Sequence, residues 1–267
     1  MRSLGIIDIQ SNLRGTKMKL RYITCSDPRE DIPVESMLNF TEKYPIAEIG
    51  VQAHPGPMSF NEHRHRWFNQ IVNNAQNMPT PPNIALHINY TWCDYMCEGL
   101  VPYELDWWLR ITNSYTNKPV IKRIQLNIGD YSDKFDIKKL TALMEKHKNQ
   151  EFIFPWNKGV AKKIEMLKQT GAKFSLLFDG SYGAGIEPNA WYAPVYKDVP
   201  NGYAGGLGPD NVAKNLDKIN EILPKNYETW IDAEGKLRDK QTTGSFTLEL
   251  AEKYLQNALA WHNQHTK

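Results

Sequence analysis

The glycines between residues 204 and 212 are the first feature that suggests chemistry. This run reads Ala-Gly-Gly-Leu-Gly-Pro-Asp-Asn-Val, a β-prone segment that passes into a glycine-rich turn and then a capped helix start. Because Gly205 and Gly206 have no side chains, phosphate oxygens can approach the backbone N–H groups, and the helix dipole favours their charge. A tight turn explains the same glycines without a ligand. The run therefore predicts a phosphate-binding loop or a structural turn.

A second loop of this kind lies nearer the carboxyl end of the chain. Residues 231–238 read Ile-Asp-Ala-Glu-Gly-Lys-Leu-Arg, so Asp232 ends a strand-like run and Gly235 follows it. We expect Gly235 to lie beside the glycines of the preceding loop, with Lys236 or Arg238 adding a positive charge. For either cation alone, a solvated charge run is the competing interpretation.

Two further residues stand at the ends of strand-like runs and could move protons. Asp179 ends the apolar run 174–178, where partial burial would raise its pKa towards that of an acid catalyst, although a loop-capping Asp is equally consistent. Cys25 ends the run 20–25 and would point into the same opening, as a base or nucleophile. A lone Cys is more often a small buried hydrophobic residue.

Short β-prone runs alternate with longer amphipathic runs along the whole chain, which is typical of repeated strand–helix units around a parallel sheet. Eight such units predict an α/β fold, the (β/α)₈ or TIM barrel, in which the loops after the strands converge at one end. The expected strands are 20–25, 48–53, 84–89, 120–128, 151–156, 174–179, 202–206 and 229–233. The expected helices are 34–43, 62–77, 103–113, 137–148, 158–170, a short segment near 189–195, 210–222 and 247–262.

Length and composition agree with one such barrel. The chain has 267 residues, close to the roughly 250 of a typical TIM barrel, with 41% hydrophobic and 23% charged residues. Its 32 Lys and Arg nearly balance 30 Asp and Glu, so neither nucleic acid nor an anionic membrane is favoured as a partner. A small molecule is the expected partner, and the composition leaves the oligomeric state open.

The ends of the chain and its cysteines suggest organisation and compartment. We expect residues 1–18 to form an N-terminal extension, with Met18 as an alternative start, and residues 19–267 to form a single barrel domain. Asp8 interrupts the first apolar run, so no signal peptide is indicated, and no apolar stretch is long enough to cross a membrane. Three cysteines are too few for a secreted disulfide framework, which predicts a cytoplasmic protein.

Taken in order, these segments resemble phosphoribosylanthranilate isomerase of tryptophan biosynthesis from about Lys19 to the end of the chain. The similar stretches are residues 23–31, 48–51, 124–127, 176–179 with the glycines that follow, and most specifically 204–212. The resemblance implies that Cys25 is the general base, that Asp179 is the general acid of an Amadori rearrangement, and that no cofactor is needed. The binding residues expected with it are Gly183, Gly185, Gly205, Gly206, Asp232 and Gly235.

The chain also departs from the family pattern. Asn127 stands where the family usually has His, and the eighth-strand motif Asp-x-Ser-Ser-Gly is shortened to residues 232–235. The Lys before the catalytic Cys is absent, since residues 23–24 read Ile-Thr, and the Arg that holds the substrate carboxylate is missing from the loop 53–60. Arg64 and Arg66 follow this loop, where a solvated helix face is their expected position.

Two alternatives remain open. The chain could be another phosphosugar barrel, such as an epimerase or a lyase, or a barrel that binds a phosphorylated metabolite without turning it over. His87, Cys93 and Cys97 are residue types that bind zinc, but their spacing does not favour a shared metal ion, and we predict none.

Overall fold

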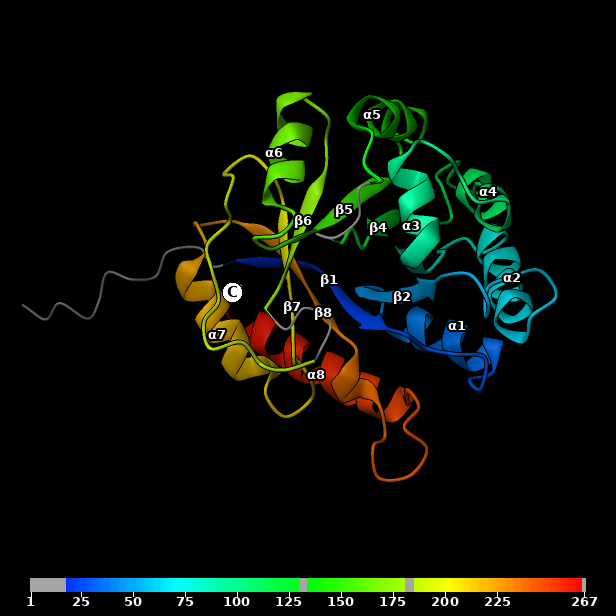
Figure 1. Cartoon of the computed structure of the whole chain (residues 1–267). Coiled ribbons are helices and arrows are strands. Elements are labelled where there is room, and N and C mark those ends of the chain that lie inside the picture. The colour runs from blue at the N-terminus through cyan, green and yellow to red at the C-terminus, as the bar shows by residue number, and fades with distance from the viewer. Residues whose placement is uncertain (1–17, 130–133, 181–184, 266–267) are drawn as a thin grey trace, which may run out of the picture.

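Eight parallel strands close into a barrel in the order of the sequence, as predicted for a (β/α)₈ fold. The computed structural model describes residues 18–129, 134–180 and 185–265. Figure 1 shows the helices around the strands, with α7 and α8 on one side and α2 to α5 on the other. The strands are β1 (Lys19–Ser26), β2 (Ala47–Ala53), β3 (Asn83–Ile88), β4 (Arg123–Leu126), β5 (Glu151–Trp156), β6 (Ser175–Asp179), β7 (Asn201–Ala204) and β8 (Glu228–Ala233).

The helices follow the predicted pattern with two differences. They are α1 (Val34–Lys43), α2 (His63–Gln76), α3 (Tyr90–Cys97), α4 (Tyr103–Arg110), α5 (Ile137–Lys146), α6 (Ala161–Gln169), α7 (Val212–Ile222), the short 3₁₀ helix η2 (Gly235–Leu237) and α8 (Leu248–His265). The sequence did not indicate α3, which begins directly after β3 and precedes α4. The helix predicted near residues 189–195 is wrong.

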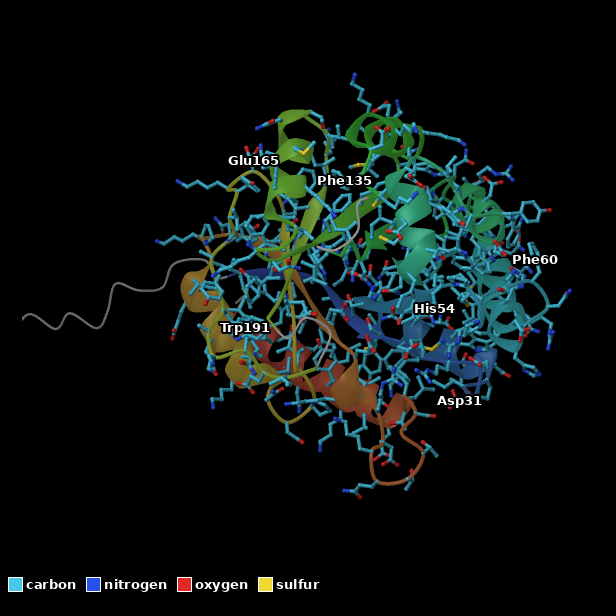
Figure 2. The ribbon with its side chains drawn as sticks, in the orientation of Figure 1. Asp31, His54, Phe60, Phe135, Glu165 and Trp191 are labelled. Atoms are coloured by element: carbon cyan, nitrogen blue, oxygen red, sulfur yellow. The ribbon has the colours of Figure 1, made fainter. Side chains whose placement is uncertain are left out.

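The segment after β6 is held by side-chain packing instead of by a helix. Pro188 and Pro194 interrupt helical hydrogen bonding there. Trp191 packs edge-on against Tyr203, with ring centroids 5.7 Å apart, and its indole N–H donates to Asn215 on α7 at 3.0 Å (Figure 2). One buried aromatic residue therefore fixes this connection to the outer layer.

The strands divide their side chains between the barrel interior and the helix layer. In β2, Ile49 and Val51 pack in the main hydrophobic core, while Glu48 on the same strand bonds to Thr24 and Arg123 across the interior. A smaller apolar cluster, containing Ile153, Leu177, Ala204 and Trp230, is separate from that core. Because side chains alternate along a strand, each interior position is two residues from the next.

The amino-terminal end of the interior contains a buried ion-pair cluster. Arg123 and Glu48 are each 1% exposed and lie 2.7 Å apart, and Glu151 lies 3.3 Å from the Arg123 side chain. The Arg123 guanidinium also stacks 4.2 Å from the Trp230 ring centroid. Burial raises the pKa of Glu48, which the Arg123 charge and the Thr24 hydroxyl oppose. We call Arg123, Glu48 and Glu151 the floor cluster.

The first described residue, Met18, is buried, and its backbone N–H donates to Asn220 on α7. The rest of the predicted extension, residues 1–17, lies outside the described residues. Within the described part of the chain, no helix has the length and apolar character needed to span a membrane.

Candidate active site

A cavity of about 870 Å³ opens at the carboxyl ends of the strands. Residues from the ends of β2 to β8 line it, together with parts of the loops that follow the strands. His54, which follows β2 and lines this mouth, is labelled in Figure 2. The sequence-predicted residues among its lining are Asp179, Gly185, Gly205, Gly206, Asp232 and Gly235. Gly183 lies outside the described residues.

Asp179 and Asp232 lie on either side of a small residue at the base of this cavity. Asp179 on β6 pairs in register with Ala204 on β7, and Ala204 pairs with Asp232 on β8. Two strand spacings separate the backbones of the two Asp residues, which is about 10 Å. Because Ala204 has only a methyl group, the space between the two carboxyl groups is available to a ligand.

Asp232 is held in a defined orientation by its neighbours. The Ser26 hydroxyl on β1 donates to Asp232 Oδ1 at 2.6 Å, and His87 Nε2 lies 4.0 Å from Oδ2. A side chain at Gly50 on β2 would overlap Ser26 Oγ and approach His87 Cε1 to 2.8 Å. Gly50 therefore provides the space in which Ser26 and His87 reach Asp232.

The charges in this group follow from burial. Burial raises the pKa of Asp232 to about 8, with contributions from Glu234, Glu48 and Asp179, against the lowering effect of the Ser26 hydrogen bond. Burial, reinforced by the Arg123 charge, lowers the pKa of His87 to about 3. At neutral pH, Asp232 is therefore mostly protonated and His87 is neutral.

Cys25 does not lie in this mouth, so the prediction that its thiol points there is wrong. It is fully buried within the main hydrophobic core and is not among the cavity-lining residues. Its neighbours on β1, Thr24 and Ser26, bond to interior residues, so alternation turns Cys25 towards the helix layer. Burial raises the pKa of its thiol, and nearby Asp232 and Glu48 raise it further. A protonated thiol in this position cannot act as a base in the mouth.

The predicted glycines form one rim of the mouth. A Cβ added at Gly185 would lie 3.8 Å from the Gly235 Cα atom, so the loops after β6 and β8 meet there. In the described part of the chain, no residue accepts a hydrogen bond from the amides of Gly205, Gly206 or Gly235. We call Gly185, Gly205, Gly206 and Gly235 the glycine rim.

Gly206 has a packing role in addition. It adopts a φ of +61°, and an added Cβ would overlap the backbone of Ile186 and Glu187. Any larger residue at this position would move the loop after β6, with or without a ligand. Gly206 substitutions therefore do not test phosphate binding cleanly, whereas a Cβ at Gly235 meets only an ordinary contact.

Replacing Gly235 by Asp should weaken the binding of inorganic phosphate at least about ten-fold, because a carboxylate would face the anion at the rim. The measurement is titration calorimetry at constant ionic strength. The control is Gln241→Asp, on the exposed loop that follows. It adds the same single negative charge to the protein and should leave the affinity for phosphate unchanged. Equal phosphate affinity in the parent and Gly235→Asp proteins would place the anion elsewhere.

An arginine cluster surrounds one carboxylate on the β1 side of the mouth, next to the loop that contains Gly235. Asp27, with a φ of +62°, bonds to Arg29 at 2.8 Å and to Arg238, and Arg64 lies 3.6 Å away. The prediction of a solvated position is wrong for Arg64, because its side chain is only 8% exposed and it pairs with Glu30 at 2.8 Å. Arg238 is likewise paired with Asp27, and Lys236 packs over Gly208.

The residues considered for metal binding are divided between two layers. His87 lines the mouth, whereas Cys93 and Cys97 are buried on α3 in the hydrophobic core. Over residues 18–129, 134–180 and 185–265, no group of three or more His, Cys, Asp or Glu side chains is arranged to hold a metal ion.

Several mouth residues were not singled out as binding residues from the sequence. They are Gln52, Asn89 and Gln125, to which His87 is added because the sequence suggested it only as a metal ligand. Ser26, which donates to Asp232 but does not line the cavity, was not singled out either. The available signal was polar residues two apart within otherwise apolar strands, such as His87 and Asn89 around Ile88.

Comparison with known proteins supports the fold. No protein-family model matches the chain, and no curated protein sequence matches it. Among solved structures, phosphoribosylanthranilate isomerase from Pyrococcus furiosus is similar, with a TM-score of 0.51 and 13% identity over 90% of this chain and 98% of that one. The enzyme from Thermococcus kodakaraensis has a TM-score of 0.51 and 12% identity over 89% and 98%. At this distance, the similarity defines the class of structure, a (β/α)₈ barrel.

Proposed function

We propose that this protein is an enzyme, an isomerase that acts on a phosphorylated sugar derivative by general acid–base catalysis. The observation that carries the proposal is the placement of Asp179 and Asp232 on either side of Ala204, below the glycine rim. The motif resemblance to phosphoribosylanthranilate isomerase supports the reaction class. Because Cys25 faces away from the mouth, the proposal gives the role of the base to Asp179 and the role of the acid to Asp232.

The phosphate group would bind at the glycine rim. Its oxygens would accept hydrogen bonds from the amides of Gly205, Gly206 and Gly235. This position, at the loops after the last two strands, is where barrels commonly bind phosphate. The sugar would then extend from the rim over Ala204, between the two carboxyl groups.

The proton transfers use both carboxyl groups. Protonated Asp232 donates its proton to the ring oxygen as the bond from C1 to that oxygen breaks. Asp179 then takes the proton from C2, and the released electron pair forms the double bond between C1 and C2. Tautomerisation of this intermediate gives the ketose. In this scheme Asp179 is the base, whereas the family resemblance implies that it is the acid.

A hydrogen-exchange experiment tests the proposal and does not require the product to be identified. The protein is incubated in D₂O with phosphoribosylanthranilate, or with aldose and ketose phosphates, and deuterium is followed by NMR at C1, which is protonated when the ketose forms, and at C2, which is protonated when the intermediate returns to the aldose. Incorporation that requires the protein would support an acid–base isomerase. Tight binding of these compounds without exchange at any carbon would instead indicate a protein that binds a phosphorylated metabolite without turnover.

Catalytic efficiency should fall by about ten-fold per pH unit above a pH of about 8, because Asp232 must be protonated to donate and its pKa is raised to about 8. Below that pH, Asp232 holds its proton and should not limit the reaction. The measurement is kcat/KM from pH 6 to about 10, in buffers of equal ionic strength. A rate that stayed constant up to pH 10 would exclude Asp232 as the acid.

A further inference from the structure

Four amide side chains form one hydrogen-bonded chain along the β2 to β4 side of the mouth. Gln125 donates to Asn127 at 2.9 Å, Asn127 donates to Asn89 at 2.8 Å, and Asn89 donates to Gln52 at 2.7 Å. Gln52 in turn donates to Glu234 Oε2 at 3.0 Å. All four amides line the cavity. We call Gln52, Asn89, Gln125 and Asn127 the amide wall.

The carboxylate at the end of the chain fixes the direction of every hydrogen bond in it. Burial and the nearby charge of Asp27 raise the pKa of Glu234, and these effects are opposed by Arg238, 3.3 Å away, and by the hydrogen bond from Gln52. In its ionised form the Glu234 carboxylate only accepts hydrogen bonds. Gln52 must therefore present its NH₂ group to Glu234 and its oxygen to Asn89. Asn89 must in turn present its NH₂ group to Gln52 and its oxygen to Asn127. Asn127 likewise presents its oxygen to Gln125, so each amide in the chain has a single orientation.

The amide wall has hydrogen-bonding capacity left over on three of its members. Asn89 uses both N–H groups, on Gln52 and on the His87 carbonyl at 2.8 Å. Gln52, Asn127 and Gln125 each use one N–H towards a described residue, which leaves one N–H and at least one oxygen lone pair on each. Residues that line one side of the cavity therefore have both unused donors and unused acceptors.

We propose that the amide wall is the head-group subsite and that it selects a neutral, polyhydroxylated group. A hydroxyl both donates and accepts, so a group with several hydroxyls can use both the N–H groups and the oxygen atoms of the amide wall. An apolar aromatic ring would instead cover these groups without bonding to them, and each buried polar group left unpaired weakens binding. The inference rests on the proposed function, because it assumes that the phosphate lies on the glycine rim opposite.

The ion pairs of the arginines in the mouth also favour a neutral head group. Arg29, Arg64 and Arg238 line the cavity, but each is paired with Asp27, Glu30 or Glu234. A head group with a carboxylate would have to compete with these acidic residues. A neutral polyol does not need to displace any of them.

The test compares phosphate compounds that differ only in the class of head group. Calorimetry with the full chain would measure affinities for glucose 6-phosphate, phenyl phosphate, inorganic phosphate and glucose. We expect glucose 6-phosphate to bind at least ten-fold more tightly than phenyl phosphate. Asn127→Leu, and separately Gln52→Met, should reduce that preference at least five-fold without changing the affinity for inorganic phosphate. Asn73→Leu on α2, outside the mouth, is the matched amide control and should behave as the parent.

The outcomes separate this inference from the proposed function. If inorganic phosphate binds but both amide variants keep the full preference, the amide wall is not the subsite while the phosphate site stands. If glucose 6-phosphate binds no more tightly than glucose, the phosphate site and with it the proposed function fail. Even then, weaker binding of free glucose to Asn127→Leu than to the parent protein would support the amide wall as a sugar subsite. Phenyl phosphate binding as tightly as glucose 6-phosphate, or no binding of any sugar, would overturn the inference.

Discussion

Replacing Asp232 by Asn should lower turnover by about 10²- to 10⁴-fold, the usual contribution of a positioned acid or base. Asp179→Asn should cause a loss of similar size, because each carboxyl group acts in the same proton-transfer sequence. Affinity for inorganic phosphate should change little in either variant, since the rim amides remain. The measurements are the rate of deuterium incorporation at C1 and C2 and phosphate calorimetry on the same samples.

The double variant provides the sharper comparison. Because the two groups serve one mechanism, Asp179→Asn and Asp232→Asn together should be little worse than either alone. Losses that multiply would indicate independent roles. A fully active Asp232→Asn protein would remove this carboxyl from the mechanism. Cys25→Ala, in contrast, should leave turnover nearly intact, since the thiol lies on the helix side of β1.

Stability can be separated from activity in the Asp232 variant. The pKa of Asp232 in the folded protein is raised to about 8 from its ordinary value of 3.8, so its contribution to stability is lost as pH rises through that range. An Asn at this position does not ionise. At pH 9, Asp232→Asn should therefore be at least as stable as the parent, and loss of activity there would not reflect unfolding.

Replacing Arg123 by Leu should lower the free energy of unfolding by about 3–5 kcal/mol, the usual cost of leaving a buried charge without its partner. Glu48, which is 1% exposed, would keep its hydrogen bond from the Thr24 hydroxyl but lose the guanidinium that balances its charge. Urea unfolding at neutral pH, followed by tryptophan fluorescence, measures the change.

Two control variants test whether the loss of stability in Arg123→Leu comes from the buried ion pair. The double variant Arg123→Leu with Glu48→Leu should recover part of the loss, because both buried charges are then absent. Lys43→Met removes the cation from an exposed pair with Glu252 and should hardly move the unfolding midpoint. If Arg123→Leu were as mild as Lys43→Met, the floor cluster would not stabilise the barrel.

The strand pattern could be predicted from the sequence because each strand carries an apolar face towards the helices. β5 occupies the predicted residues 151–156, and the remaining strands differ from prediction mostly at their ends. α3 was not predicted because residues 90–97 are too short for a clear helical period and lie directly after β3. The helix near residues 189–195 was predicted from the repeat, and the prolines there act against it.

The site was harder to predict because a position at a strand tip does not show which side of the sheet a side chain faces. Asp179 and Asp232 both face the interior, whereas Cys25, also near a strand tip, faces the helices. The useful signal in β1 is the alternation of polar Thr24 and Ser26 with Ile23 and Cys25. The amide wall joins residues that lie in or directly after three strands, β2, β3 and β4, and such contacts cannot be predicted from one strand at a time.

The floor cluster has a consequence for how the barrel closes during folding. Arg123 on β4 reaches Glu48 on β2 across the intervening strand, and this contact exists only when all three strands are in native register. If β4 slipped by one residue, the Arg123 side chain would face the apolar helix layer. Glu48 would then be buried without the positive charge that balances its own. A barrel with its strands in a non-native register would therefore have a higher free energy, because it buries unpaired charges. In this way the ion pair between Arg123 and Glu48 favours the native register over others that apolar side chains alone would allow.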